Sequence, residues 1–146
     1  MTLLTLAQAS TIIDKALEHG RALKLKPLGV AVLDAGGHLF AFKREDGTSI
    51  LRPQIAQGKA WGVLGMGFGG RELARRAAAA PTFVTALMTA SEGRLVPVPG
   101  GVLIRSAEGA IIGSVGISGD TSDQDEACAV YGIKAAGLVP DTGDVG

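Results

Sequence analysis

Apolar residues near the start of the chain recur at intervals of three and four, the spacing of one face of an α-helix. They are Leu6, Ala9, Ile13, Ala16, Leu17 and Gly20. Thr5 and Gln8, at the start of this run, have the T-x-x-Q spacing of a capping box. In a capping box the side chain of each residue accepts a hydrogen bond from the backbone N–H of the other. The pattern predicts a helix over residues 6–23 that ends before Pro27.

Two hairpins are predicted further along the chain. Residues 29–34 and 38–44 are rich in strand-forming side chains and flank the turn sequence Ala35-Gly36-Gly37. Residues 94–105 and 110–118 form a similar pair around a turn at 106–109. Pro97 and Pro99 confine any strand at the start of the second pair to a sheet edge.

Residues 49–90 predict three consecutive helices, with breaks at 65–70 and at Pro81. The first break matches the dinucleotide-binding pattern G-x-G-x-x-G, but it follows a helix-like segment and not a buried strand. We therefore favour a helix–helix connection over a phosphate site. A last helix is predicted to begin at a cluster of capping residues, 118–122, and to carry an apolar stripe that includes Ala127 and Tyr131.

This order of elements predicts an α/β fold of the α+β type. Strands joined by hairpins give a mostly antiparallel sheet of about five strands. We expect the helices to pack chiefly on one face and to leave the other face open as a subunit contact. Residues 1–146 are expected to form one domain, with a flexible tail at 140–146.

Composition narrows the class of partner. Lys plus Arg and Asp plus Glu number 14 each, so the zero net charge argues against a dedicated binder of nucleic acid or anionic membranes. No apolar stretch is long enough to span a membrane. The N-terminus shows no secretory signal, and Cys128 is the single cysteine, so we expect a cytoplasmic protein. Zero net charge and 22 glycines favour association of copies.

Candidate metal ligands have simpler interpretations. Asp120, Asp123 and Asp125 fit the first turn of a helix, where acids complement the helix dipole, so no metal site is predicted. For His19 we favour a solvated helix face over an axial haem ligand, the alternative that a single histidine allows. His38 is expected at the surface of a hairpin end, and Cys128 as a small core residue.

The segment Pro99-Gly100-Gly101 predicts a tight turn, because Pro presets one turn angle and Gly permits a positive φ at the next position. Its backbone N–H groups suit an anion, although a plain type II turn needs no ligand. We expect this turn and residues 118–125 to form one wall of a ligand site. Asp125 alternatively caps the last helix internally.

Several segments of the sequence, taken together, resemble the GlcG/HbpS-like family, whose members are often called haem-degrading domains. The matching segments are Leu4 to Ala9, the hairpin from Val32 to Leu39, Arg44-Glu-Asp46-Gly, Lys59-Ala60, Pro99-Gly100-Gly101, and Ile112 to Gly119 leading to Asp125 and Ala129. The resemblance covers nearly the whole chain. One departure is Leu103, where relatives usually have Pro or a small residue after Gly-Gly-Val.

The resemblance implies an antiparallel α/β domain assembled as a homo-oligomer such as a tetramer or octamer. Some relatives bind haem, and others are encoded with glycolate-utilisation enzymes or fused to a cobalamin adenosyltransferase. The first hypothesis is a cytoplasmic protein that binds haem or a related tetrapyrrole between subunits, with auxiliary catalysis. The sequence leaves open whether the protein is an enzyme.

Two alternatives remain at this stage. One is an enzyme that acts on a small carboxylate or carbonyl metabolite, with Asp125 and Lys59 as its catalytic residues. The other is a structural partner of a metabolic enzyme. The residues expected to bind the small-molecule ligand are Arg44, Pro99, Gly100, Gly101, Ser118, Gly119 and Thr121.

Overall fold

The computed structural model describes residues 2–144. Its elements in chain order are α1 (Leu6–Ala22), β1 (Gly29–Asp34), β2 (Leu39–Arg44), α2 (Arg52–Met66), α3 (Gly70–Ala79), α4 (Pro81–Ala90), β3 (Gly101–Arg105), β4 (Ile111–Ser118), α5 (Ser122–Ala135) and β5 (Val139–Asp141). Both predicted hairpins and the three consecutive helices are present. No helix within residues 2–144 has the length and apolar character needed to cross a bilayer.

The strands form one sheet in the order β2-β1-β4-β3-β5, and every neighbouring pair is antiparallel. The α+β class and the five-stranded antiparallel sheet are therefore confirmed. β1 and β4 lie at the centre, and Gly29 of β1 is the partner of both Arg44 on β2 and Ser118 on β4. This pairing places the last residues of β2 and β4 at the same end of the sheet, beside the first residue of β1.

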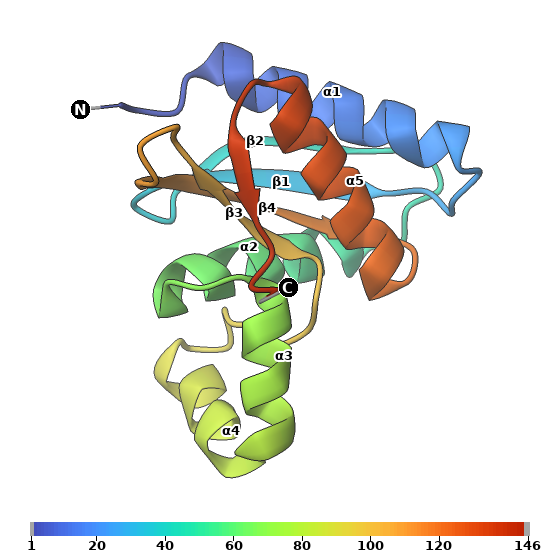
Figure 1. Cartoon of the computed structure of the whole chain (residues 1–146). Helices are drawn as coiled ribbons and strands as arrows, with labels where there is room; N and C mark the ends of the chain where they lie inside the picture. The colour runs from blue at the N-terminus through green and yellow to red at the C-terminus, as the bar shows by residue number, and fades with distance from the viewer. Residues whose placement is uncertain (1, 145–146) are drawn as a thin grey trace.

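Helices cover both faces of the sheet, with α1 and α5 on one side and α2 on the other (Figure 1). Val115 and Ile117 belong to the core that includes Ile12 of α1 and Cys128 of α5. The alternate residue Ser114 points the other way and donates a hydrogen bond of 2.8 Å from its Oγ to the carbonyl of residue 60 on α2. The second face was expected to be open, and α2 covers it instead.

The contact between α2 and the sheet depends on residues without bulky side chains. A Cβ added at Gly116 would lie 1.9 Å from the carbonyl oxygen of Ala56, and one at Gly101 would lie 2.4 Å from the carbonyl oxygen of Lys59. The helix backbone therefore rests directly on these two strands. Close backbone contact, and not a stripe of large apolar side chains, holds α2 against the sheet.

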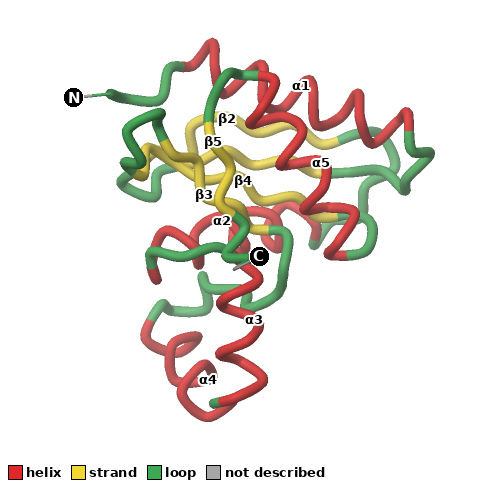
Figure 2. Tube along the Cα trace, viewed as in Figure 1, coloured by secondary structure: helices red, strands yellow, loops and turns green. Residues whose placement is uncertain are grey.

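α3 and α4 project away from the sheet as a helical pair (Figure 2). Buried Leu73, Val84 and Leu95 form a small second core beneath this pair, with Trp61 packed against it. Most of α4 is exposed to solvent, including Phe83 and Met88. The pair is therefore attached to the rest of the fold through a narrow contact.

Two predicted local signals are confirmed. Thr5 and Gln8 form the capping box, because the Thr5 Oγ1 accepts from the Gln8 N–H and the Gln8 Oε1 accepts from the Thr5 N–H. The glycine-rich break joins α2 to α3, with Gly67 at φ 79° ending one helix and Gly69 preceding the next. The segment is a helix–helix connection.

The C-terminal segment differs from the expected tail. Pro140 and Asp141 belong to β5, which pairs with β3, and the carboxylate of Asp141 accepts a hydrogen bond of 2.9 Å from Arg105. Residue 71 donates its backbone N–H to the carbonyl of Thr142. Residues 145 and 146 of the expected tail lie outside the described residues.

Candidate functional site

The turn at residues 99–101 and the start of α5 meet at one buried side chain, Lys59 of α2. Gly100 has the expected positive φ, 116°, and a Cβ there would lie 2.8 Å from the Lys59 Nζ. The same Nζ donates to the carbonyl of Ile117 at 2.9 Å and to Oδ2 of Asp125 at 3.1 Å. The structure thus brings together several of the residues expected at the site.

Lys59 and Asp125 form a buried ion pair. Only 3% of the Lys59 side chain and 1% of the Asp125 side chain are exposed. The second oxygen of Asp125 accepts the backbone N–H of Asp120 at 3.0 Å. The carboxylate is thus bound both by Lys59 and by a backbone N–H just before α5, whereas the N-cap of that helix is Thr121.

Burial acts on both members of the pair. It lowers the pKa of the Lys59 ammonium, and attraction to Asp125 opposes that change. Burial likewise raises the pKa of Asp125, and the charge of Lys59 opposes the change. Because each charge has little water around it, each depends on the other for stabilisation.

The first turn of α5 is occupied by the protein's own side chains. Thr121 caps the helix by accepting the Gln124 N–H at 3.3 Å. Asp120 accepts the N–H of Thr121 through Oδ1 and that of Lys26 through Oδ2, and these hydrogen bonds lower the pKa of Asp120. An external anion at this helix end would compete with these carboxylates. Ligand binding by Gly119 and Thr121 therefore stays a prediction.

Ser118 is fully buried, and its Oγ accepts a hydrogen bond of 3.0 Å from Nη1 of Arg52. The sequence analysis did not identify Arg52. A signal was present, because a cation in the first turn of a helix opposes the helix dipole and so indicates a specific partner. Arg52 also acts electrostatically on Lys59, which places two cations beside the end of β4.

Arg44 is not part of this cluster. It is exposed and lines a hollow of about 520 Å³ with residues from α1 and β2. The other lining residues are Leu17, Arg21, Pro27, Lys43, Glu45 and Asp46. Arg44 was expected to bind the same ligand as Pro99, Gly100 and Gly101, but it lines a different hollow.

A second set of ionic contacts joins α5 to α3. Arg71 binds Oε1 of Glu126 at 2.9 Å and Oδ1 of Asp123 at 3.0 Å. The Oε2 atom of Glu126 is buried without a hydrogen-bond partner among the described residues. The sequence analysis missed the link, because the partners are more than fifty residues apart and both charge types are common on helix surfaces.

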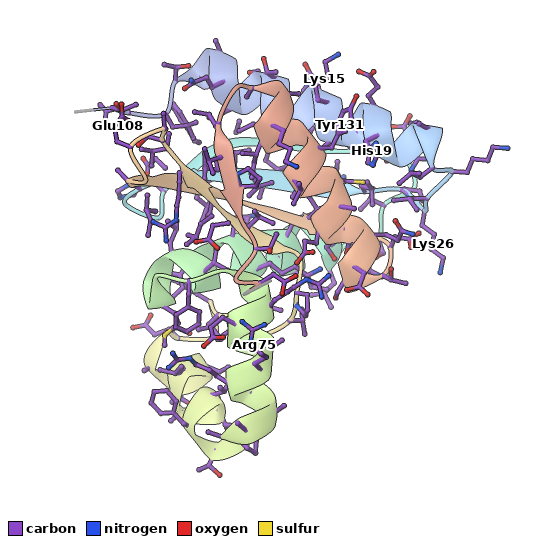
Figure 3. All side chains as sticks on the ribbon, in the orientation of Figure 1. Lys15, His19, Lys26, Arg75, Glu108 and Tyr131 are labelled. Carbon is purple, nitrogen blue, oxygen red and sulfur yellow. The ribbon has the colours of Figure 1, made fainter. Side chains whose placement is uncertain are left out.

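The candidate haem ligands differ in their surroundings. His19 stacks on Tyr131 with ring centroids 4.4 Å apart and an interplanar angle of 9°, and Figure 3 shows the two rings between α1 and α5. His38 is 81% exposed and contacts Asp34 at 3.2 Å. Cys128 is fully buried, and burial raises the pKa of its thiol to about 11, as fits a core residue.

A family model described as haem degrading protein, HbpS-like, matches residues 4–134. The chain therefore belongs to the HbpS-like family. No curated protein matches the chain.

Solved structures share the fold over nearly the whole chain. A crystal structure of a PduOC–heme complex is 25% identical, with a TM-score of 0.85, and the match covers 98% of this chain and 100% of that one. HbpS is 27% identical, with a TM-score of 0.78 and coverage of 92% and 90%. The Klebsiella pneumoniae protein ORFY is 22% identical, with a TM-score of 0.84 and coverage of 94% and 93%.

Proposed function

We propose that this chain is a cytoplasmic, homo-oligomeric protein that binds haem or a related tetrapyrrole, with any catalysis secondary to binding. One observation carries the proposal, namely the similarity over the full domain to a protein crystallised with heme. Membership of the HbpS-like family supports the same ligand.

Among the side chains that could bind the haem iron as an axial ligand, a histidine at the surface fits best. Cys128 is excluded as a ligand by its burial and its high thiol pKa. His38 lies at an exposed hairpin end against Asp34. His19 is half-buried, is held in orientation by Tyr131, and keeps part of its ring at the surface. His19 is therefore the imidazole that we assign to the iron.

The surroundings of His19 also suit such a ligand. Tyr131 is 41% exposed, so its ring offers an apolar surface beside the imidazole. Lys15, one turn before His19 on α1, pairs with Glu18 at 3.0 Å, and this exposed ammonium could exchange that carboxylate for a haem propionate. Bound haem would contribute its iron chemistry, and the chain would orient the imidazole. A second copy would cover the exposed face, as expected for a site between subunits.

A Soret absorbance titration tests the proposal. Wild-type protein is expected to give a saturable Soret band with haem, and His19→Ala is expected to lose it. His38→Ala is the matched control, because it removes the other histidine, and it should leave the spectrum unchanged. An absent Soret shift in the wild type would refute haem binding, whereas equal spectra for wild type and His19→Ala would refute the assignment of the ligand.

The buried Lys59–Asp125 pair beside Gly100 favours a second candidate, an enzyme acting on a small carboxylate or carbonyl compound. In that case Lys59 would hold the anion and Asp125 would accept a proton, while Ser118, Pro99 and Gly101 would line the site. Asp125→Ala and Lys59→Ala are each assayed for melting temperature and for binding of haem and small carboxylates. Lower stability with unchanged binding in both variants would eliminate this candidate.

A further inference from the structure

A hollow of about 440 Å³ lies between the end of the β1–β2 hairpin, the outer side of α2 and the turn that follows α4. The residues that line it include Leu33, Gly37, Leu39, Trp61, Glu92 and Arg94. The volume is within the range of small-molecule sites, roughly 300–1,000 Å³. None of these residues belongs to the Lys59–Asp125 cluster or contacts His19.

The interior of the hollow is apolar on one side. Leu33 and Leu39 come from the hairpin, and the indole of Trp61 comes from α2. Gly37 holds the turn close to the indole, because a Cβ at this residue would lie 3.3 Å from the Trp61 Nε1. The turn and the tryptophan thus form a fixed apolar wall.

The rim of the hollow carries four polar side chains. Within residues 2–144, the side chains of Gln54, Gln57, Glu92 and Arg94 form no hydrogen bond or ion pair. The Arg94 guanidinium lies 5.6 Å from the centroid of the Trp61 ring, so a cation–π contact positions it. Its N–H donors remain available to a ligand.

The turn that carries Glu92 and Arg94 is held by its own hydrogen bonds. The N–H of Glu92 donates to Thr89, that of Gly93 donates to Met88, and that of Arg94 donates to Ser91. Glu92 has a positive φ of 57°, a conformation that such contacts maintain. The two charged side chains therefore emerge from a defined turn at the edge of the hollow.

Arg94 and Glu92 line the same hollow without pairing with each other. A ligand with one charge would satisfy only one of them and would be repelled by the other. A zwitterion with an apolar body would satisfy both charges and would also cover Leu33, Leu39 and Trp61. We propose that this hollow binds a free amino acid with an apolar side chain. Its carboxylate binds Arg94, and its ammonium binds Glu92. The site is independent of haem binding.

Trp61 reports directly on this site, because it is the only tryptophan in the chain. The full-length protein is titrated with L-phenylalanine while tryptophan fluorescence and binding heat are followed. Three comparison compounds each lack one feature: 3-phenylpropionate has no ammonium, phenethylamine has no carboxylate, and glycine has no apolar side chain. L-Phenylalanine is expected to bind saturably and at least about tenfold more tightly than each of them.

Two variants test the charged residues. Arg94→Gln and Glu92→Gln are each expected to weaken L-phenylalanine binding about tenfold or more, and both should fold because neither side chain has an ionic partner. Arg75→Gln, which removes an arginine outside the hollow, is the matched control and should bind as the wild type does. The proposal would be overturned if L-phenylalanine did not bind saturably, or if the three comparison compounds bound as tightly as L-phenylalanine. Unchanged affinity for L-phenylalanine in both hollow variants would also overturn it.

Discussion

The Nζ of Lys59 and the Oδ2 of Asp125 lie 3.1 Å apart although 66 residues separate them in the chain. Lys59 belongs to α2 on one face of the sheet, and Asp125 belongs to α5 on the other. The ion pair passes the end of β4, where the Ile117 carbonyl also accepts from Nζ. It therefore links the layers that the sheet separates.

Breaking this pair on one side should destabilise the protein strongly. Asp125→Ala leaves a buried ammonium without its counter-charge, and the expected loss is about 3–5 kcal/mol of the free energy of unfolding. The double variant Lys59→Met/Asp125→Leu removes both charges and should recover much of that loss. Urea unfolding of the wild type, Lys59→Met, Asp125→Leu and the double variant measures the coupling. A double variant whose loss equals the sum of the single losses would show that the pair is not coupled.

The buried thiol of Cys128 should make the folded protein less stable in alkaline solution. The folded state holds the thiol proton up to a pKa of about 11, whereas the unfolded thiol has the ordinary value of 9.0. Between these values the folded state binds more protons, so the stability falls as pH rises, by roughly 2–3 kcal/mol in total. Urea unfolding at pH 8 and pH 11 is compared for wild type and Cys128→Ala. The variant should lose less stability, and an equal loss in both proteins would contradict the prediction.

Gly101→Ala should disturb the contact between α2 and the sheet. The added methyl would lie 2.4 Å from the Lys59 carbonyl oxygen, a backbone atom that cannot move without the helix. We expect a loss of about 1–3 kcal/mol or more. Gly29→Ala is the matched control on β1, because its nearest new contact is an ordinary 3.7 Å to the Phe42 ring. Thermal unfolding of both variants checks this, and similar melting temperatures would show that α2 adjusts freely.

Light scattering should give a molar mass that is a multiple of 14.8 kDa at micromolar concentration. Zero net charge removes long-range repulsion between copies, and large apolar side chains are exposed at Ile50, Leu51 and Phe83. Ile50→Asp and Phe83→Asp, measured separately, test whether either of these two surfaces is a subunit contact. A mass of one chain for the wild type would contradict the expectation.

Local signals predicted much of this fold correctly. The Thr5–Gln8 capping box marks the start of α1, and the glycines at 65–70 mark the connection between α2 and α3. These features depend on residues close together in sequence, so their chemistry is readable without the tertiary structure. The positive φ of Gly100 was predictable for the same reason, because a proline precedes it.

Features that depend on distant segments were not predictable. The side of α2 that meets the sheet consists of small residues such as Ala56 and Ala60, so it lacks the apolar stripe that reveals a buried helix face. β5 has three residues and includes a proline, which is too short a pattern to recognise. Lys59 and Asp125 were both identified as candidate residues, but their direct pairing is a tertiary contact that residue spacing does not specify.

The backbone contact between α2 and the sheet limits how the sequences of homologues can diverge. Gly101 and Gly116 lie against the carbonyls of Lys59 and Ala56, so the space is limited by main-chain atoms that no side-chain change can remove. A larger residue at either glycine requires the whole helix to shift, and such a shift would also alter the position of Lys59. Substitutions at these glycines should therefore be rare among family members that retain the Lys59–Asp125 pair. Where they occur, changes in α2 and at the start of α5 should accompany them.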